Sequence, residues 1–80
     1  MKEWYVYVIR NRNNVLYTGI AKDTERRLAE HNGGGGAKFT RGRGPWALVH
    51  GEGPMAHGDA LRREIQIKKD RALKKTLKAD

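Results

Sequence analysis

The stretch that most constrains the fold of this chain is WYVYVI, residues 4–9, which is apolar or aromatic at nearly every position. A half-exposed strand alternates apolar and polar residues, whereas an unbroken apolar run is typical of a strand covered on both faces. We therefore expect residues 4–9 to form the central strand of a sheet.

The residues that follow predict an antiparallel hairpin and a helix. The turn formers NRNN occupy residues 11–14, and residues 15–20 suit a second strand. Asp23 is a good N-cap for a helix with Glu25 in its first turn, and Asn32 and Gly33 are stop signals. This first half therefore predicts strand, strand, helix.

The second half predicts one more strand and two helices. Residues 46–50 suit a short strand, and Gly51 to Pro54 suit a turn. A helix is expected from Met55 or Ala56 to Lys69, and Asp70 would cap a final helix carrying Leu73 and Leu77 on one face. The whole order predicts an α+β fold, with a three-stranded antiparallel sheet flanked by helices.

Length and composition restrict the class of protein. Eighty residues suit one domain, residues 1–80. The sequence contains no cysteine, which excludes a disulfide-linked partner and a thiolate zinc site. No stretch resembles a signal peptide or could span a membrane, so we expect a cytoplasmic protein.

The charge of the chain favours a polyanionic partner. There are 17 Lys and Arg against 9 Asp and Glu, which gives a formal net charge of +8. Such a bias in a small chain favours nucleic acid over a membrane surface, because no helix except the short C-terminal one combines apolar and cationic faces. The alternative is a charge that only keeps the protein soluble.

A glycine-rich basic loop is the candidate nucleic-acid contact. Gly33 to Gly36 form either a flexible or a closely approached loop, and AKFTRGRGPW follows at residues 37–46. Aromatic and basic residues interleaved in this way suit contacts to a nucleic-acid backbone. They suit a solvated loop equally well, with Trp46 packed on the core. The candidate contacts are Lys38, Arg41 and Arg43.

Catalytic side chains are expected where the second strand meets the first helix. Arg27 and His31 are four residues apart and share a helix face, and Tyr17 lies just upstream. A guanidinium binds phosphate oxygens in a planar fork, and a phenol or imidazole can move a proton. The combination suits chemistry on a phosphate.

Glu64 interrupts the apolar arc of the second predicted helix. That arc comprises Ala60, Leu61, Ile65 and Ile67. A carboxylate on a buried face is costly unless it is paired or bound to a cation. Glu64 is therefore either a metal ligand or a partner in a structural ion pair. One carboxylate with water and substrate phosphate is enough for Mg²⁺.

Taken together, these motifs resemble the GIY-YIG endonuclease domain superfamily, and most closely its small single-domain bacterial YhbQ-like (UPF0213) group. The first family motif corresponds to residues 5–7, ending at Tyr7, and the second to residues 17–19, ending at Gly19. The family arginine falls on Arg27, the histidine one turn later on His31, and the metal-binding glutamate on Glu64. Thr18 replaces the isoleucine of the second motif.

The resemblance implies a metal-dependent endonuclease that cleaves phosphodiester bonds, in DNA rather than RNA, on structured or single-stranded substrates in repair or recombination. It implies one Mg²⁺ or Mn²⁺ ion on Glu64, with Tyr7, Tyr17 or His31 as general base and Gly19 at the nucleic acid. We expect Tyr7, Tyr17, Arg27 and Glu64 to line one shallow cleft. The alternative is a non-catalytic nucleic-acid-binding module of the same fold.

Overall fold

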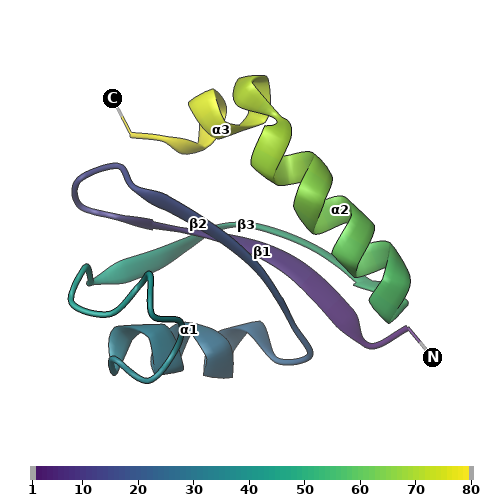
Figure 1. Ribbon diagram of the computed structural model, residues 1–80, viewed down its shortest axis with the longest axis horizontal. Helices are drawn as coiled ribbons and strands as arrows, with labels where there is room; N and C mark the ends of the chain where they lie inside the picture. The colour runs from purple at the N-terminus through teal and green to yellow at the C-terminus, as the bar shows by residue number, and fades with distance from the viewer. Residues whose placement is uncertain (1, 80) are drawn as a thin grey trace.

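The computed structural model describes residues 2–79, which form an antiparallel sheet of strand order β2-β1-β3 with three helices. The elements are β1 (Trp4–Asn11), β2 (Leu16–Ala21), α1 (Thr24–Asn32), β3 (Trp46–Met55), α2 (His57–Lys69) and α3 (Arg71–Leu77). Helix α1 covers one face of the sheet, and α2 and α3 cover the other (Figure 1). The α+β class, the element order and the central position of β1 are confirmed.

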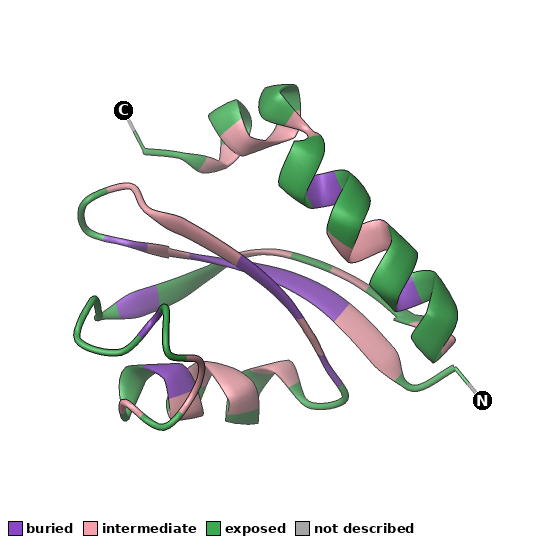
Figure 2. Cartoon of the chain, in the orientation of Figure 1, coloured by how far each residue is buried: buried purple, intermediate pink, exposed green. Residues whose placement is uncertain are grey.

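Strand β1 sends alternate side chains into two separate cores. Its four central residues, 6–9, are all at most 2% exposed (Figure 2). Val6 and Val8 pack with Ala60 and Ile67 beneath α2. Tyr7 and Ile9 face α1 instead, because successive side chains of a strand point to opposite sides of the sheet. This alternation decides which helix each β1 side chain contacts.

The predicted helix boundaries agree with the structure. The Asp23 Oδ1 atom accepts a hydrogen bond of 3.0 Å from the backbone N–H of Arg26, and α1 ends at Gly33. The Asp70 carboxylate accepts a bond of 2.9 Å from the N–H of Leu73 and so caps α3. Among residues 2–79, no helix is long and apolar enough to cross a membrane.

The expected turn at Gly51 to Pro54 is wrong, because β3 continues through these residues to Met55. Gly51 pairs with Tyr7 and Glu52 with Val6, and a register shift separates these pairs from the pair of Trp4 with Met55. Gly53 has φ of +134°, and a Cβ atom there would lie 2.7 Å from the Trp4 carbonyl oxygen. Strand β3 is an edge strand, where proline is tolerated.

The predicted apolar arc of α2 is half wrong. Ala60 and Ile67 are fully buried, but Leu61 and Ile65 are 41% and 54% exposed. The helix rests on the sheet along the narrow row at positions 60, 64 and 67, so the apolar residues beside this row stay in solvent. Glu64 lies in the row, and its side chain is 20% exposed.

Candidate active site

Tyr7 and His31 form a buried pair between the sheet and α1. The Tyr7 hydroxyl lies 2.7 Å from His31 Nε2, although the two residues are 24 positions apart in sequence. Tyr7 pairs with Gly19 of β2, and a Cβ atom at Gly19 would lie 2.5 Å from the Tyr7 hydroxyl. The missing side chain at Gly19 therefore gives the phenol its path across β2 towards α1.

Gly19 is itself buried and makes room for Tyr7, and its contact with nucleic acid stays a prediction. Gly36 serves His31 in a similar way. A Cβ atom at Gly36 would collide with His31 Nδ1 and would lie 2.9 Å from its Cα. The glycine run is thus closely approached at this end.

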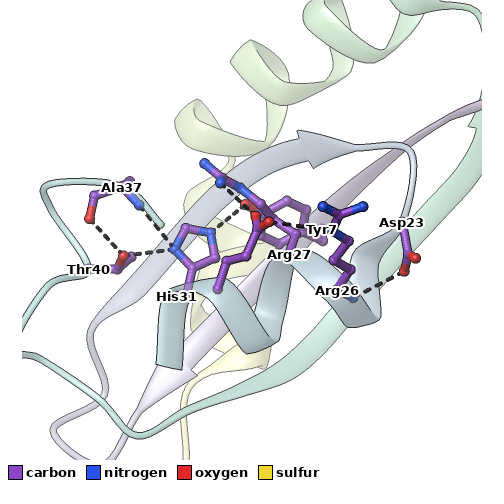
Figure 3. Close-up of polar contacts among 8 residues, drawn as sticks. Tyr7, Asp23, Arg26, Arg27, His31, Ala37 and Thr40 are labelled. Carbon is purple, nitrogen blue, oxygen red and sulfur yellow. Dashed lines mark hydrogen bonds and ion pairs between the residues drawn. The ribbon is translucent and has the colours of Figure 1, made fainter. Parts of the chain in front are cut away.

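Helix α1 places Arg27 next to the pair. Arg27 precedes His31 by four residues, and its guanidinium lies beside the Tyr7 phenol (Figure 3). The Nη1 atom of Arg27 donates a hydrogen bond of 3.0 Å to Glu30 Oε1, and the Arg27 side chain is 32% exposed. Arg27 is therefore anchored at one end while part of the guanidinium still faces solvent.

Hydrogen bonds from the basic loop hold the imidazole. Thr40, which is 1% exposed, places its Oγ1 atom 2.7 Å from His31 Nδ1 and donates a bond of 3.0 Å to the Ala37 carbonyl (Figure 3). A hydroxyl has one proton. Because that proton goes to Ala37, and because the 2.7 Å contact with Thr40 is much shorter than the 3.4 Å contact from the Ala37 N–H to Nδ1, we assign to Nδ1 a proton donated to Thr40, which leaves Nε2 to accept from Tyr7. The network assigns this tautomer.

Burial keeps both partners of the pair neutral. Burial raises the pKa of Tyr7 above its ordinary value of 10.0, although hydrogen bonding towards Arg27 opposes the rise. Burial, and then the positive charge of Arg27, lower the pKa of His31 below its ordinary value. The hydrogen bond to Glu30 raises the pKa of Arg27, which stays a cation. At neutral pH the site therefore holds a phenol, a free imidazole and a guanidinium.

Tyr17 lies at the solvent side of the pair. Its ring meets His31 edge-on at 5.1 Å and stacks on Phe39 at 5.8 Å, measured between ring centroids. Arg43 covers Phe39, with its guanidinium carbon 4.9 Å from the ring centre. Trp46 is buried and donates from Nε1 to the Thr40 carbonyl, as expected of a core residue.

The basic loop stands beside this cluster, and its three predicted contact residues, Lys38, Arg41 and Arg43, are all exposed. Arg41 donates a hydrogen bond of 3.3 Å from Nε to the Gly34 carbonyl, which folds the loop back on the glycine run. The cationic groups are therefore free to meet a polyanion near Tyr17.

Glu64 lies on α2, whereas the other expected catalytic residues lie on β1, β2 and α1. It belongs to α2, which packs on the Val6 face, while Tyr7 and Tyr17 belong to the α1 face. Because alternation along β1 and β2 fixes the faces, Glu64 can meet Tyr17 only around the edge of β2, and the single cleft stays a prediction. Helix α2, which carries Glu64, packs against β2. The negative charge of Glu64 raises the pKa of Tyr7, although it contributes less than burial, Tyr17 and Arg27 do.

Glu64 is the carboxylate that the sequence assigned to a divalent ion. Glu64 Oε2 lies 3.5 Å from the ammonium of Lys68, whose side chain is 55% exposed. Within residues 2–79, no three His, Cys, Asp or Glu side chains gather as a metal cage. This donor set fits Mg²⁺ or Mn²⁺ held by Glu64 together with water and substrate phosphate, and it fits no ion that needs several protein ligands.

Sequence reasoning missed Thr40. Thr40 lies among basic and aromatic residues, which predicted an exposed nucleic-acid contact. It becomes buried only because the loop folds over α1. A small hydroxyl residue four positions after the glycine run was the available signal.

Comparison with known proteins agrees with this geometry. The profile of the GIY-YIG catalytic domain matches residues 3–77. A UPF0213 protein of Halobacterium salinarum is 49% identical over 74 residues, which cover 91% of this chain and 96% of that protein. A UPF0213 protein of Natronomonas pharaonis is 49% identical over 77 residues, covering 95% and 91%.

A solved structure supports the fold. The solution NMR structure of a UPF0213 protein from Bacillus halodurans shares 38% identity with this chain and superposes with a TM-score of 0.53, covering 91% of this chain and 78% of that one. The names of these relatives state a family and no reaction. The chain therefore belongs to the GIY-YIG catalytic domain family, a nuclease family, and within it to the UPF0213 proteins.

Proposed function

We propose that this protein is a metal-dependent endonuclease that hydrolyses phosphodiester bonds in nucleic acid, with DNA preferred over RNA. The observation that carries the proposal is the 2.7 Å contact between the Tyr7 hydroxyl and the neutral His31 imidazole beside a partly exposed arginine. This arrangement joins a proton acceptor to a phosphate-binding cation.

The proton path runs from water through Tyr7 to His31. Tyr7 cannot act as a standing phenolate at neutral pH, because burial raises its pKa. It can take a proton from the attacking water only as it passes its own proton to His31 Nε2. Thr40 holds the imidazole so that this nitrogen is free to accept. His31 is then the final base and Tyr7 the relay.

Arg27 binds the phosphate in this proposal. A guanidinium next to the reacting oxygens stabilises the negative charge that develops on phosphorus-bound oxygen. Its charge also holds the pKa of His31 down, so the imidazole is available as a base at neutral pH. Tyr17 lines the approach to the phosphate.

Glu64 is the residue that would hold Mg²⁺ or Mn²⁺. When bound, such an ion polarises a scissile phosphate and steadies the leaving oxygen. Lys38, Arg41 and Arg43 would bind phosphates on the substrate backbone and position it without reading sequence.

One observation favours the alternative of a non-catalytic nucleic-acid-binding module. Glu64 already has a cationic neighbour in Lys68, and its helix packs on the face of the sheet away from Tyr7. A protein of this fold that binds nucleic acid without cutting it would keep the basic loop and need no ion.

Three substitutions test the proposal with labelled DNA strands, forks and duplexes in the presence and absence of Mg²⁺ or Mn²⁺. Tyr7→Phe removes the relay oxygen and should abolish cleavage. Tyr5→Phe is its control, because it removes a phenol from the same strand away from His31, and it should cleave at the parent rate.

Glu64→Gln should abolish cleavage and leave nucleic-acid binding unchanged. The variant should lose less than about 0.5 kcal/mol of stability, because the pair with Lys68 is a partly exposed (i, i+4) contact. A Tyr7→Phe protein that cuts as fast as the parent would refute the relay. A parent that binds every substrate and cuts none would favour the binding module.

A further inference from the structure

We propose that the groove along the outer edge of β2 is a second nucleic-acid contact, which binds the phosphate backbone of the strand that enters the candidate active site. The inference rests on the proposed function and extends it. It assigns a substrate path to lysines of α2 and α3 that are separate from the basic loop.

The groove is a defined feature of the surface. It has a volume of about 580 Å³ and runs between residues 14–18 and the helices on the far face of the sheet. Phe39 lies at one end. Three lysines line the opposite wall: Lys68, Lys74 and Lys78. Their ammonium groups give the groove a positive charge that suits a chain of phosphates.

The helical wall of the groove is fixed to the sheet. Arg10 Nη1 donates a hydrogen bond of 2.7 Å to the Leu77 carbonyl at the end of α3. Asn14 and Ala79 exchange two hydrogen bonds, of 2.7 and 2.8 Å, across the groove end. These contacts hold Lys74 of α3 and Lys78, just after it, opposite β2 before any ligand binds, which lowers the entropic cost of binding.

The groove also reaches the candidate site from both faces. Tyr17, which packs against His31, forms part of the groove wall. Lys68, in the same groove, lies 3.5 Å from Glu64. The groove therefore crosses the β2 edge that separates Glu64 from the Tyr7–His31 pair. A strand lying in it would pass next to both.

A membrane surface fits this groove less well than nucleic acid does. Interfacial helices insert an apolar face between lipids. The apolar residues of α3, Leu73 and Leu77, pack instead on the Val6–Val8 core. What α3 presents to solvent is its cationic side.

The test compares two double variants that remove the same charge. Lys74→Ala with Lys78→Ala removes two groove lysines. Lys69→Ala with Lys75→Ala removes two exposed lysines, one from α2 and one from α3, that do not line the groove. Alanine favours helix, so both variants should fold, and thermal melts check this. Glutamine replacements at 74 and 78 serve as a second version.

The measurement is the affinity for a fluorescent mixed-sequence DNA strand and its duplex, in metal-free buffer, over a range of salt concentrations. The slope of log K against log salt should become shallower by about 1.4 units for the strand and about 1.8 for the duplex in the groove variant, if both lysines meet phosphates. The matched control should keep the parent slope.

Equal slopes in the two double variants would overturn the inference. So would binding to phosphatidylserine vesicles that requires Lys74 and Lys78 while DNA binding does not. Failure of the proposed function is a separate result, because a parent that never cleaves can still show, or fail to show, the groove-specific change in slope.

Discussion

Thr40→Val tests the hydrogen-bond network that sets the state of His31. Valine keeps the shape of threonine and removes its hydroxyl, which is 1% exposed. The substitution deletes the 2.7 Å contact to His31 Nδ1 and the 3.0 Å bond to the Ala37 carbonyl. The nearest remaining partner for Nδ1 is the Ala37 N–H, at 3.4 Å. Because an N–H can only donate, we expect the imidazole proton to move to Nε2.

The expected cost follows from these two contacts. The Ala37 carbonyl keeps its 3.1 Å bond from the Thr40 N–H but loses the hydroxyl bond, and one imidazole bond is exchanged for a longer one, which together cost about 2 kcal/mol. A chain of this length has a stability of roughly 4–12 kcal/mol, so the variant should fold. Its melting temperature should fall by about 8–16 °C. Cleavage should fall much further, because Nε2 would donate to Tyr7 and could no longer accept its proton.

The assay is the tautomer of His31, measured by long-range ¹⁵N–¹H NMR, together with thermal melts and cleavage rates. Thr40→Ser is the matched control, since serine keeps the hydroxyl and should keep the Nδ1–H form and the activity. If Thr40→Val retains the Nδ1–H tautomer and the parent melting temperature, the assigned network is wrong.

Three further substitutions follow from the same contacts. Gly19→Ala places a Cβ about 2.5 Å from the Tyr7 hydroxyl, so it should lose about 1–3 kcal/mol in urea unfolding and reduce cleavage, and parent-like values for both would contradict the packing. Alanine at all three basic-loop positions should flatten the salt dependence of DNA binding by about 2–3 units, whereas an unchanged slope would remove the loop from the contact surface; the positions are Lys38, Arg41 and Arg43. Arg63 and His50 hold the pKa of Glu52 at about 2, so this carboxylate stabilises the fold above its ordinary pKa of 4.5 and loses that effect as the pH falls through about 2. Glu52→Gln should cost about 1–2 kcal/mol at pH 7, after solvent screening, and should remove part of the acid destabilisation between pH 4.5 and 2, which melts over that range will show.

The local features of this protein were determined by the sequence alone. The unbroken apolar run at residues 4–9 predicted a strand that is covered on both faces. In the structure, β1 is the central strand of the sheet and lies between two helical layers. Asp23 and Asp70 cap their helices because capping depends on a few neighbouring residues. The spacing of the motifs also indicated the family. Arg27 and His31, for example, share a helix face because they are one turn apart, which is a local property of the sequence.

Only the tertiary structure decided which side chains meet. Tyr7 and the helix that carries Glu64 lie on opposite faces because two-residue alternation fixes the side of each strand residue relative to its neighbours and not the helix that covers it. Leu61 and Ile65 remain exposed because a three-stranded sheet supports only one narrow row of α2. The contacts of His31 with Tyr7 and Thr40 join three separate segments of the chain, as does the groove between β2 and α3. No local pattern encodes such contacts, because they form only when distant segments pack together.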